Sequence, residues 1–137
     1  MLLIGFTFSL LARENKSKTK IVFKSPLSDT VTKANKISLA KLRKTYKLFQ
    51  GQQVETEGII WFEFENVSIC PSRNSLSSDE KRCFWLDFRE DLNFNDSLMR
   101  TASGKEFIIK GTIDTSRKGH LGMYLGTIKD IYFMQQK

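Results

Sequence analysis

Hydrophobic and polar residues alternate along much of the chain after Gln53, which is the period of a β-strand. The segment "VETEGIIWFEF" places Val54, Thr56, Gly58, Ile60, Phe62 and Phe64 on one face and mostly polar residues on the other. Four further runs are predicted as strands: "NVSIC" (66–70), "CFWLDF" (83–88), "KEFIIKGTID" (105–114) and "HLGMYLGTIKDIYF" (120–133). Gly58, in the middle of the first strand, indicates a bend or bulge such as a small barrel requires.

The period changes in the segment before these strands. "SLAKLRKTYKLFQG" predicts an amphipathic helix with Ser38 as its N-cap and Gly51 just beyond its end. Its apolar face consists of Leu39, Leu42, Tyr46 and Phe49. We expect this face to pack on the sheet that follows.

The order of elements predicts a mainly β (α+β) fold, a five-stranded OB-fold-like Greek-key barrel preceded by one amphipathic helix. An insert, "REDLNFNDSLMRTASG", separates the third and fourth strands. Leu92, Leu98 and Met99 predict a short helix or cover there. With 137 residues the chain has room for one domain, which we place at 37–137.

The net charge of +7 is unevenly distributed along the chain. Residues 1–50 contain eleven Lys or Arg and two acidic residues, whereas residues 51–137 contain eleven basic and thirteen acidic residues. The positive charge therefore belongs to the N-terminal arm and first helix. Residues 13–36 are rich in Lys, Ser, Thr and Asn and are predicted to be a polar basic tether, with a short strand at Lys20 to Lys24.

The first twelve residues are predicted to be a signal peptide. Eleven mostly apolar residues, Leu2 to Ala12, precede the lysine-rich stretch; this run is too short to span a bilayer but fits the apolar region of a secretory signal. We therefore expect a periplasmic or secreted protein with no integral membrane span. The alternative is a cytoplasmic protein in which Leu2 to Leu11 is an element of the fold.

Cys70 and Cys83 flank the twelve polar residues "PSRNSLSSDEKR", so they lie at the two ends of a long loop. Alternation from Val67 and Ile69, and from Phe84 and Leu86, points both cysteines to the outer face of the barrel. This arrangement predicts a cross-strand disulfide; two free thiols are the alternative. Two Cys and one distant His do not make a zinc ligand set, so no metal site is expected.

Three short patterns carry a resemblance to a known group of proteins: "V-x-x-x-G" at Val54 to Gly58, "F-x-x-x-G-x-x-D" at Phe107 to Asp114, and "G-x-I-x-x-I" at Gly126 to Ile131. Over about residues 38–133 the chain resembles small bacterial OB-fold proteins, both the exported group and those similar to tRNA anticodon-binding domains. The resemblance implies the fold more than the function, because these groups are largely uncharacterised.

In an OB barrel the ligand face is built from outward residues of the second and third strands and from the loops between strands one and two and between strands four and five. Mapped onto this chain, the candidate binding residues are Glu63, Glu65 and Asn66 in the first loop, Ser68, Trp85, Asp87 and Arg89 on the strands, and Arg117, Lys118 and His120 in the last loop. Trp61, Trp85 and Tyr124 form either an aromatic patch for a partner or a surface covered by the first helix or the N-terminal arm.

His120 is the only histidine and lies between Gly119 and Gly122. We interpret it as part of a glycine-shaped turn before the last strand and as a rim contact. The chain has no serine or cysteine in a nucleophile motif, no phosphate loop and no metal-ligand cluster. We therefore expect neither an enzyme nor a cofactor.

These observations favour an exported, non-catalytic binding domain that recognises a macromolecule, most plausibly a protein, through the outer barrel face and the Pro71 to Arg82 loop. An inhibitor or immunity-type protein is one form of this hypothesis. The alternative is a single-stranded nucleic-acid binder that uses the basic N-terminal arm, with Trp61 and Trp85 stacking on bases and Arg117 and Lys118 pairing with phosphates. The acidic residues Glu55, Glu57, Glu63, Glu65 and Asp87 argue against that alternative.

Overall fold

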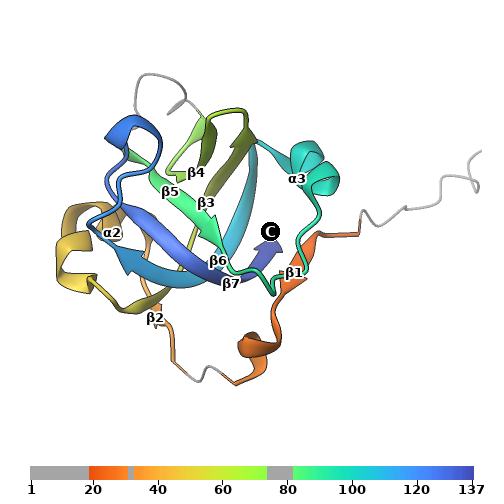
Figure 1. The fold of residues 1–137 in the computed structure, drawn as a ribbon, viewed down its shortest axis with the longest axis horizontal. Coiled ribbons are helices and arrows are strands. Elements are labelled where there is room, and N and C mark those ends of the chain that lie inside the picture. The colour runs from red at the N-terminus through yellow and green to blue at the C-terminus, as the bar shows by residue number, and fades with distance from the viewer. Residues whose placement is uncertain (1–18, 31–32, 74–81) are drawn as a thin grey trace, which may run out of the picture.

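A computed structural model describes residues 19–30, 33–73 and 82–137 (Figure 1). Its strands are β1 (Val22–Lys24), β2 (Asn35–Lys36), β3 (Gln53–Glu63), β4 (Asn66–Cys70), β5 (Phe84–Phe88), β6 (Lys105–Asp114) and β7 (Thr127–Gln136). The α-helices are α2 (Leu39–Thr45) and α3 (Asp96–Ala102), and 3₁₀ turns occur at Pro26–Asp29, Tyr46–Phe49 and His120–Gly122. Within these ranges, no helix is long and apolar enough to cross a membrane.

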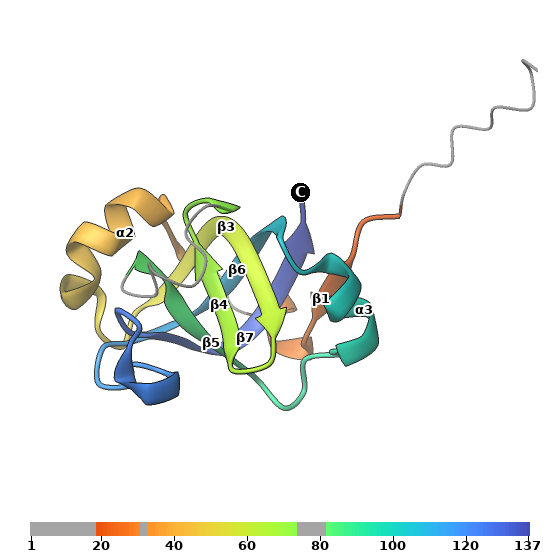
Figure 2. The same cartoon turned by 90° about the horizontal axis from the view of Figure 1, so that it is seen from above.

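Five of the strands close into a barrel. β3 pairs antiparallel with β4, β4 with β5, β6 with β7 and β6 with β3, while β5 and β7 pair in parallel. Figures 1 and 2 show these strands wrapped around a common interior, with α2 and α3 at different sides of the barrel. This order, with its single parallel pair, is that of the OB-fold, so the predicted fold class is confirmed.

β3 is the strand that both halves of the barrel share. Its first part pairs with β6 from Gln53 to Ile60, and its last part pairs with β4 from Ile59 to Glu63. Gly58 lies just before this change of partner, and a β-carbon there would lie 2.8 Å from both the Cys70 carbonyl oxygen and the Leu39 side chain. The pairing of β3 with β6 runs through Gly58 without a change of register, so the predicted bulge is absent there. What requires a glycine is the close approach between the strand, its neighbour and the helix.

Alternating residues of the strands fill the barrel as their pattern predicts. Val54, Ile60, Ile69, Phe84 and Phe107 are completely buried. Leu42 of α2 is also fully buried and Leu39 nearly so, while Tyr46 and Phe49 pack against the same core. Ser38 caps α2 by accepting a hydrogen bond from the Lys41 amide at 3.2 Å, and Gly51 has a φ of 75° beyond its end. The predicted helix is thus confirmed, although its last turn is 3₁₀.

Part of the predicted tether joins the barrel. β1 pairs antiparallel with β7, which confirms the predicted short strand near 20–24, and β2 adds a parallel edge to β3. Phe23 of β1 is only 5% exposed. Ile21 also packs against the core, so the packed structure begins before residue 37 despite the polar composition of this segment. The predicted signal peptide at 1–12 lies outside the described residues, as does most of the Pro71 to Arg82 loop.

The last strand begins later than its apolar pattern predicts. β7 starts at Thr127, opposite Asp114 of β6, rather than at His120. Gly119, Leu121 and Gly122 have φ values of 68°, 55° and 67°, which are incompatible with extended strand geometry. Residues 115–126 therefore form a loop, as the turn interpretation of His120 predicted. The insert contains the predicted short helix, α3, which buries Met99 but leaves Leu98 partly exposed.

We expect Gly58→Ala to lower the free energy of unfolding by about 1–3 kcal/mol, because the added methyl group overpacks the junction of β3, β4 and α2. Gly126→Ala is a matched control without a positive φ, and its β-carbon would meet its nearest atom at 3.3 Å. Urea unfolding of the two variants measures the difference. Equal losses would show that the junction can relax.

Candidate functional site

The outer face of β4 and β5 carries the predicted binding surface. Ser68, Cys70, Cys83, Trp85 and Asp87 alternate with inward residues, and Cys70 and Cys83 form a disulfide with their Cα atoms 4.5 Å apart. Both cysteines are almost completely buried. The predicted cross-strand disulfide is confirmed, and it ties together the two ends of the loop that joins β4 to β5.

A second hydrophobic cluster lies on this outer face, separate from the barrel core. It contains Trp61, Cys70, Cys83 and Tyr124, with Ile59 and Trp85 packed against it. Trp61 is 8% exposed and Tyr124 4% exposed. The rings of Trp85 and Tyr124 meet edge to face, with 5.2 Å between their centroids. The aromatic side chains of this face therefore pack chiefly on one another and on the disulfide.

Among the described residues, the β6–β7 loop, residues 115–126, covers Trp85, whereas Gly104 lies against Trp61, where a β-carbon would be 3.2 Å from the ring. Tyr124 of this loop donates a hydrogen bond from its hydroxyl to Asn66 Oδ1 at 3.0 Å, and Ser68 Oγ donates to the same oxygen at 2.7 Å. The backbone of Gly119 lies so close to Trp85 that a β-carbon there would be 2.7 Å from the Trp85 side chain. The cover predicted from the first helix or the N-terminal arm is thus supplied by a loop instead.

The start of this loop is fixed by Asp114, at the end of β6. Ser116 donates to its carboxylate from both the amide, at 3.0 Å, and the hydroxyl, at 2.6 Å, and Lys129 Nζ lies 3.4 Å from the other oxygen. These hydrogen bonds from Ser116, with the added charge of Lys129, lower the pKa of Asp114. The carboxylate therefore stays ionised and holds the first turn of the loop to the barrel.

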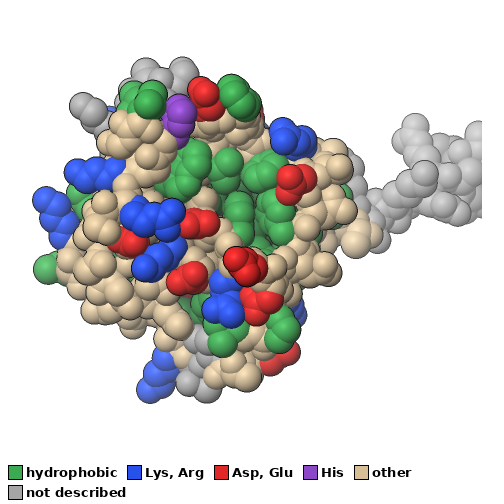
Figure 3. Space-filling view, viewed as in Figure 1, with side chains coloured by type: hydrophobic (Ala, Val, Ile, Leu, Met, Phe, Trp, Pro, Cys, Tyr) green, Lys and Arg blue, Asp and Glu red, His purple; other side chains and the backbone are tan. Residues whose placement is uncertain are grey.

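An ion pair and a histidine–carboxylate contact join the predicted loop residues to β5 and to the β3–β4 turn. Arg117 Nη1 lies 2.9 Å from Asp87 Oδ2, and His120 Nε2 lies 3.5 Å from Glu65 Oε2. Figure 3 shows basic and acidic side chains next to one another over β5 and β7. These contacts are exposed, so each contributes little to stability, but Asp87 neutralises the Arg117 charge that a phosphate would meet.

A pocket of about 350 Å³ lies between the loop and β5, lined by Trp85, Arg117, Lys118, Gly119, His120 and Thr127. The structure therefore brings together most of the predicted site. Glu63 points to solvent, and Trp61 lies beneath the surface. Arg89 lies elsewhere, paired with Asp91 at 2.9 Å. His, Cys, Asp and Glu side chains form no group of three or more able to hold a metal ion within the described part of the chain.

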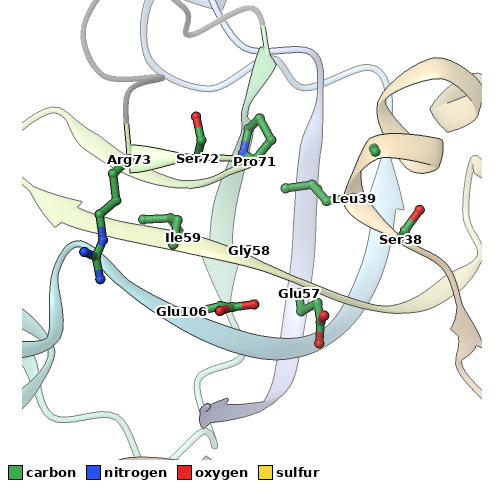
Figure 4. A pocket seen from close by; sticks show the side chains of 10 residues that line it. Ser38, Leu39, Glu57, Gly58, Ile59, Pro71, Ser72, Arg73 and Glu106 are labelled. Atoms are coloured by element: carbon green, nitrogen blue, oxygen red, sulfur yellow. The ribbon is translucent and has the colours of Figure 1, made fainter.

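A second pocket, of about 340 Å³, lies where α2 begins and was not foreseen from the sequence (Figure 4). Leu39, Ile59 and Pro71 surround its apolar part, with Glu57 and Glu106 along one edge. Lys137 Nζ bridges these two carboxylates, 3.1 Å from Glu57 and 3.3 Å from Glu106, and these contacts raise its pKa. The lining residues come from distant parts of the chain, so no local sequence signal could have joined them.

Replacing both cysteines, as Cys70→Ala with Cys83→Ala, should lower the free energy of unfolding by about 3 kcal/mol, because the closed loop restricts the unfolded chain. Urea unfolding measures this loss. The wild-type protein in reductant is the control and should lose a similar amount. Identical unfolding midpoints for oxidised protein and double variant would contradict the stabilising role.

His120→Ala should change the free energy of unfolding by less than about 1 kcal/mol, because its pair with Glu65 is exposed. Gly119→Ala should cost more, about 1–3 kcal/mol, because it adds a methyl group against Trp85 at a φ of 68°. Near-UV circular dichroism should change only for Gly119→Ala. The opposite order of the two losses would mean that His120, rather than Gly119, holds the loop in place.

Comparison with known proteins found no relative of this chain. No protein-family model matches the chain, no curated protein matches it, and no solved structure matches it. The candidate site is the outer face of an OB-fold barrel. A loop covers this face and a disulfide closes it.

Proposed function

We propose that this protein is a non-catalytic binding domain that recognises a protein partner and works in an oxidising compartment, either the periplasm or outside the cell. The observation that carries the proposal is the covered outer face. The disulfide, Tyr124 and Gly119 hold the β6–β7 loop and the strands in one arrangement. A rigid, preorganised surface lowers the entropy cost of binding a folded partner.

The compartment is argued from the disulfide. Buried cross-strand disulfides persist in oxidising environments and are rare in the cytosol of mesophiles. The apolar run from Leu2 to Ala12, interpreted as a signal peptide, points in the same direction. The resemblance to exported bacterial OB-fold proteins agrees with this proposal, and an inhibitor or immunity-type protein is its most concrete form.

Binding of single-stranded nucleic acid is less well supported. Such proteins present exposed aromatic rings to bases and free cations to phosphates. Here Trp61 is buried, Trp85 packs under Gly119 and against Tyr124, and Arg117 is paired with Asp87. The exposed lysines of the N-terminal arm and of the α2 segment remain in favour of it: Lys20, Lys24, Lys33, Lys36, Lys41, Lys44 and Lys47.

Intact mass of the native, cell-derived protein tests the compartment. We expect loss of about the first dozen residues and a deficit of about two daltons that reductant removes, since export and disulfide formation accompany each other. A full-length chain with free thiols would place the protein in the cytoplasm and contradict this part of the proposal.

Binding assays test the partner class. We expect in vivo crosslinking to join the protein to a protein partner, and a labelled single-stranded oligonucleotide to show no saturable binding. Lys41→Gln with Lys44→Gln and Lys47→Gln should leave partner binding unchanged. Saturable oligonucleotide binding that weakens steeply with salt and is lost in this triple variant would support the nucleic-acid function instead.

A further inference from the structure

One end of the barrel is filled by aromatic side chains from segments that are distant in sequence. Phe94, in the segment before α3, lies at the centre: its ring centroid is 4.6 Å from that of Phe88 and 5.3 Å from those of Phe23 and Phe62. Arg100 of α3 lies over the Phe62 ring at 5.4 Å. We call these four phenylalanines the Phe94 cluster.

The Phe94 cluster is incompletely covered. α3 has only seven residues and buries Met99 and Ala102, so it closes part of this end. Phe62, Phe88 and Phe94 keep some exposure. Nearby, Phe64 at the β3–β4 turn is 88% exposed and Leu98 of α3 is 43% exposed. Figure 3 shows hydrophobic side chains gathered in the middle of this face, between the β3–β4 hairpin and α3.

An acidic groove adjoins the cluster. It has a volume of about 580 Å³ and is lined by Asp87, Phe88, Arg89, Glu90, Asp91 and Asp130. Phe88 belongs to both features, because it lines the groove and stacks on Phe94. Figure 3 shows the acidic side chains that lie directly beside the hydrophobic area. The apolar and acidic surfaces are therefore continuous.

The groove keeps a net negative charge although Arg117 pairs with Asp87 and Arg89 pairs with Asp91. Arg89 makes two hydrogen bonds to the Asp91 carboxylate, at 2.9 and 3.1 Å, and is thereby held by a carboxylate of the groove itself. That contact lowers the pKa of Asp91. Glu90 and Asp130 have no ion pair within the described residues. The groove thus concentrates the excess of acidic residues found in residues 51–137, which contain thirteen acidic and eleven basic residues.

We propose that the Phe94 cluster, Phe64 and the acidic groove form a docking surface for a basic segment of a partner protein that carries an aromatic or aliphatic anchor residue. This inference rests on the proposed function and names the surface and the chemistry of the partner. The anchor packs on the exposed edges of the phenylalanines, and lysine or arginine side chains beside it enter the groove. Such a central apolar contact with complementary charges around it is the usual arrangement of binding hot spots.

A peptide library displayed on phage and selected on the immobilised full-length, disulfide-bonded protein tests this surface. We expect the selected peptides to combine Lys or Arg with an aromatic or aliphatic residue. One selected peptide, synthesised with a fluorophore, then reports affinity by anisotropy. Phe64→Ala should weaken its binding about tenfold or more, as removal of a hot-spot side chain does.

The double variant Glu90→Gln with Asp130→Asn should also weaken the binding of the peptide and reduce the salt dependence of that binding. Asparagine tolerates the φ of 49° at position 130, so this variant removes charge without straining the backbone. Leu48→Ala and Leu121→Ala are matched controls, because their side chains are 75% and 78% exposed in other segments. Both controls should bind the peptide as the wild type does.

The proposal is overturned if no peptide is selected, if the selected peptides are acidic or neutral, or if the Phe64 and groove variants bind normally. A second copy of the chain is the other candidate occupant of this surface, and sedimentation of the wild type and Phe64→Ala tests it. A wild-type dimer that Phe64→Ala dissociates would assign the surface to that second copy instead. A protein partner that is crosslinked equally by wild type and the Phe64 and groove variants would refute this surface while leaving the proposed function standing.

Discussion

Closure of the barrel depends on the close contact at Gly58. There β3 is paired with Phe107 of β6, one residue before its pairing with β4 begins at Ile59, and α2 lies against the same point through Leu39. A side chain at position 58 would push β3 away from both the Cys70 carbonyl oxygen and α2. The close packing of β3, β4 and α2 at this point therefore requires a residue without a β-carbon.

The position of the disulfide on the outer face follows from the direction of β4 toward Cys70. β4 ends at Cys70, beside the start of β5, so that the disulfide joins the two strands where their loop departs. The disulfide then becomes a hydrophobic floor on which Trp61, Trp85 and Tyr124 pack. Because the β6–β7 loop is fastened by Asp114 at its start and by Tyr124 near its end, the face is a preorganised surface rather than an open groove.

The outer face of β4 and β5 and the barrel end at the Phe94 cluster differ in how completely their aromatic residues are covered. At the outer face, aromatic residues are paired, hydrogen-bonded and covered. At the end occupied by the Phe94 cluster, a short α3 leaves aromatic edges and Phe64 exposed beside carboxylates. Exposed apolar groups are costly in water and are commonly kept where a partner will cover them. The contrast within one small domain is the physical basis for proposing, beside the preorganised outer face, a second surface on which a basic segment of the partner docks.

The sequence by itself determined the local elements. Alternation determined the strands, a period near 3.6 and Ser38 determined α2, and the opposite phase of Cys70 and Val67 determined that the disulfide lies outside the core. These properties depend on neighbours along the chain. Tertiary structure decided the parallel closure of β5 on β7, the burial of Phe23 within a polar segment, the burial of Trp61, and the meeting of Phe88, Phe94 and Asp130. Those depend on contacts between residues far apart in sequence, which no local period encodes.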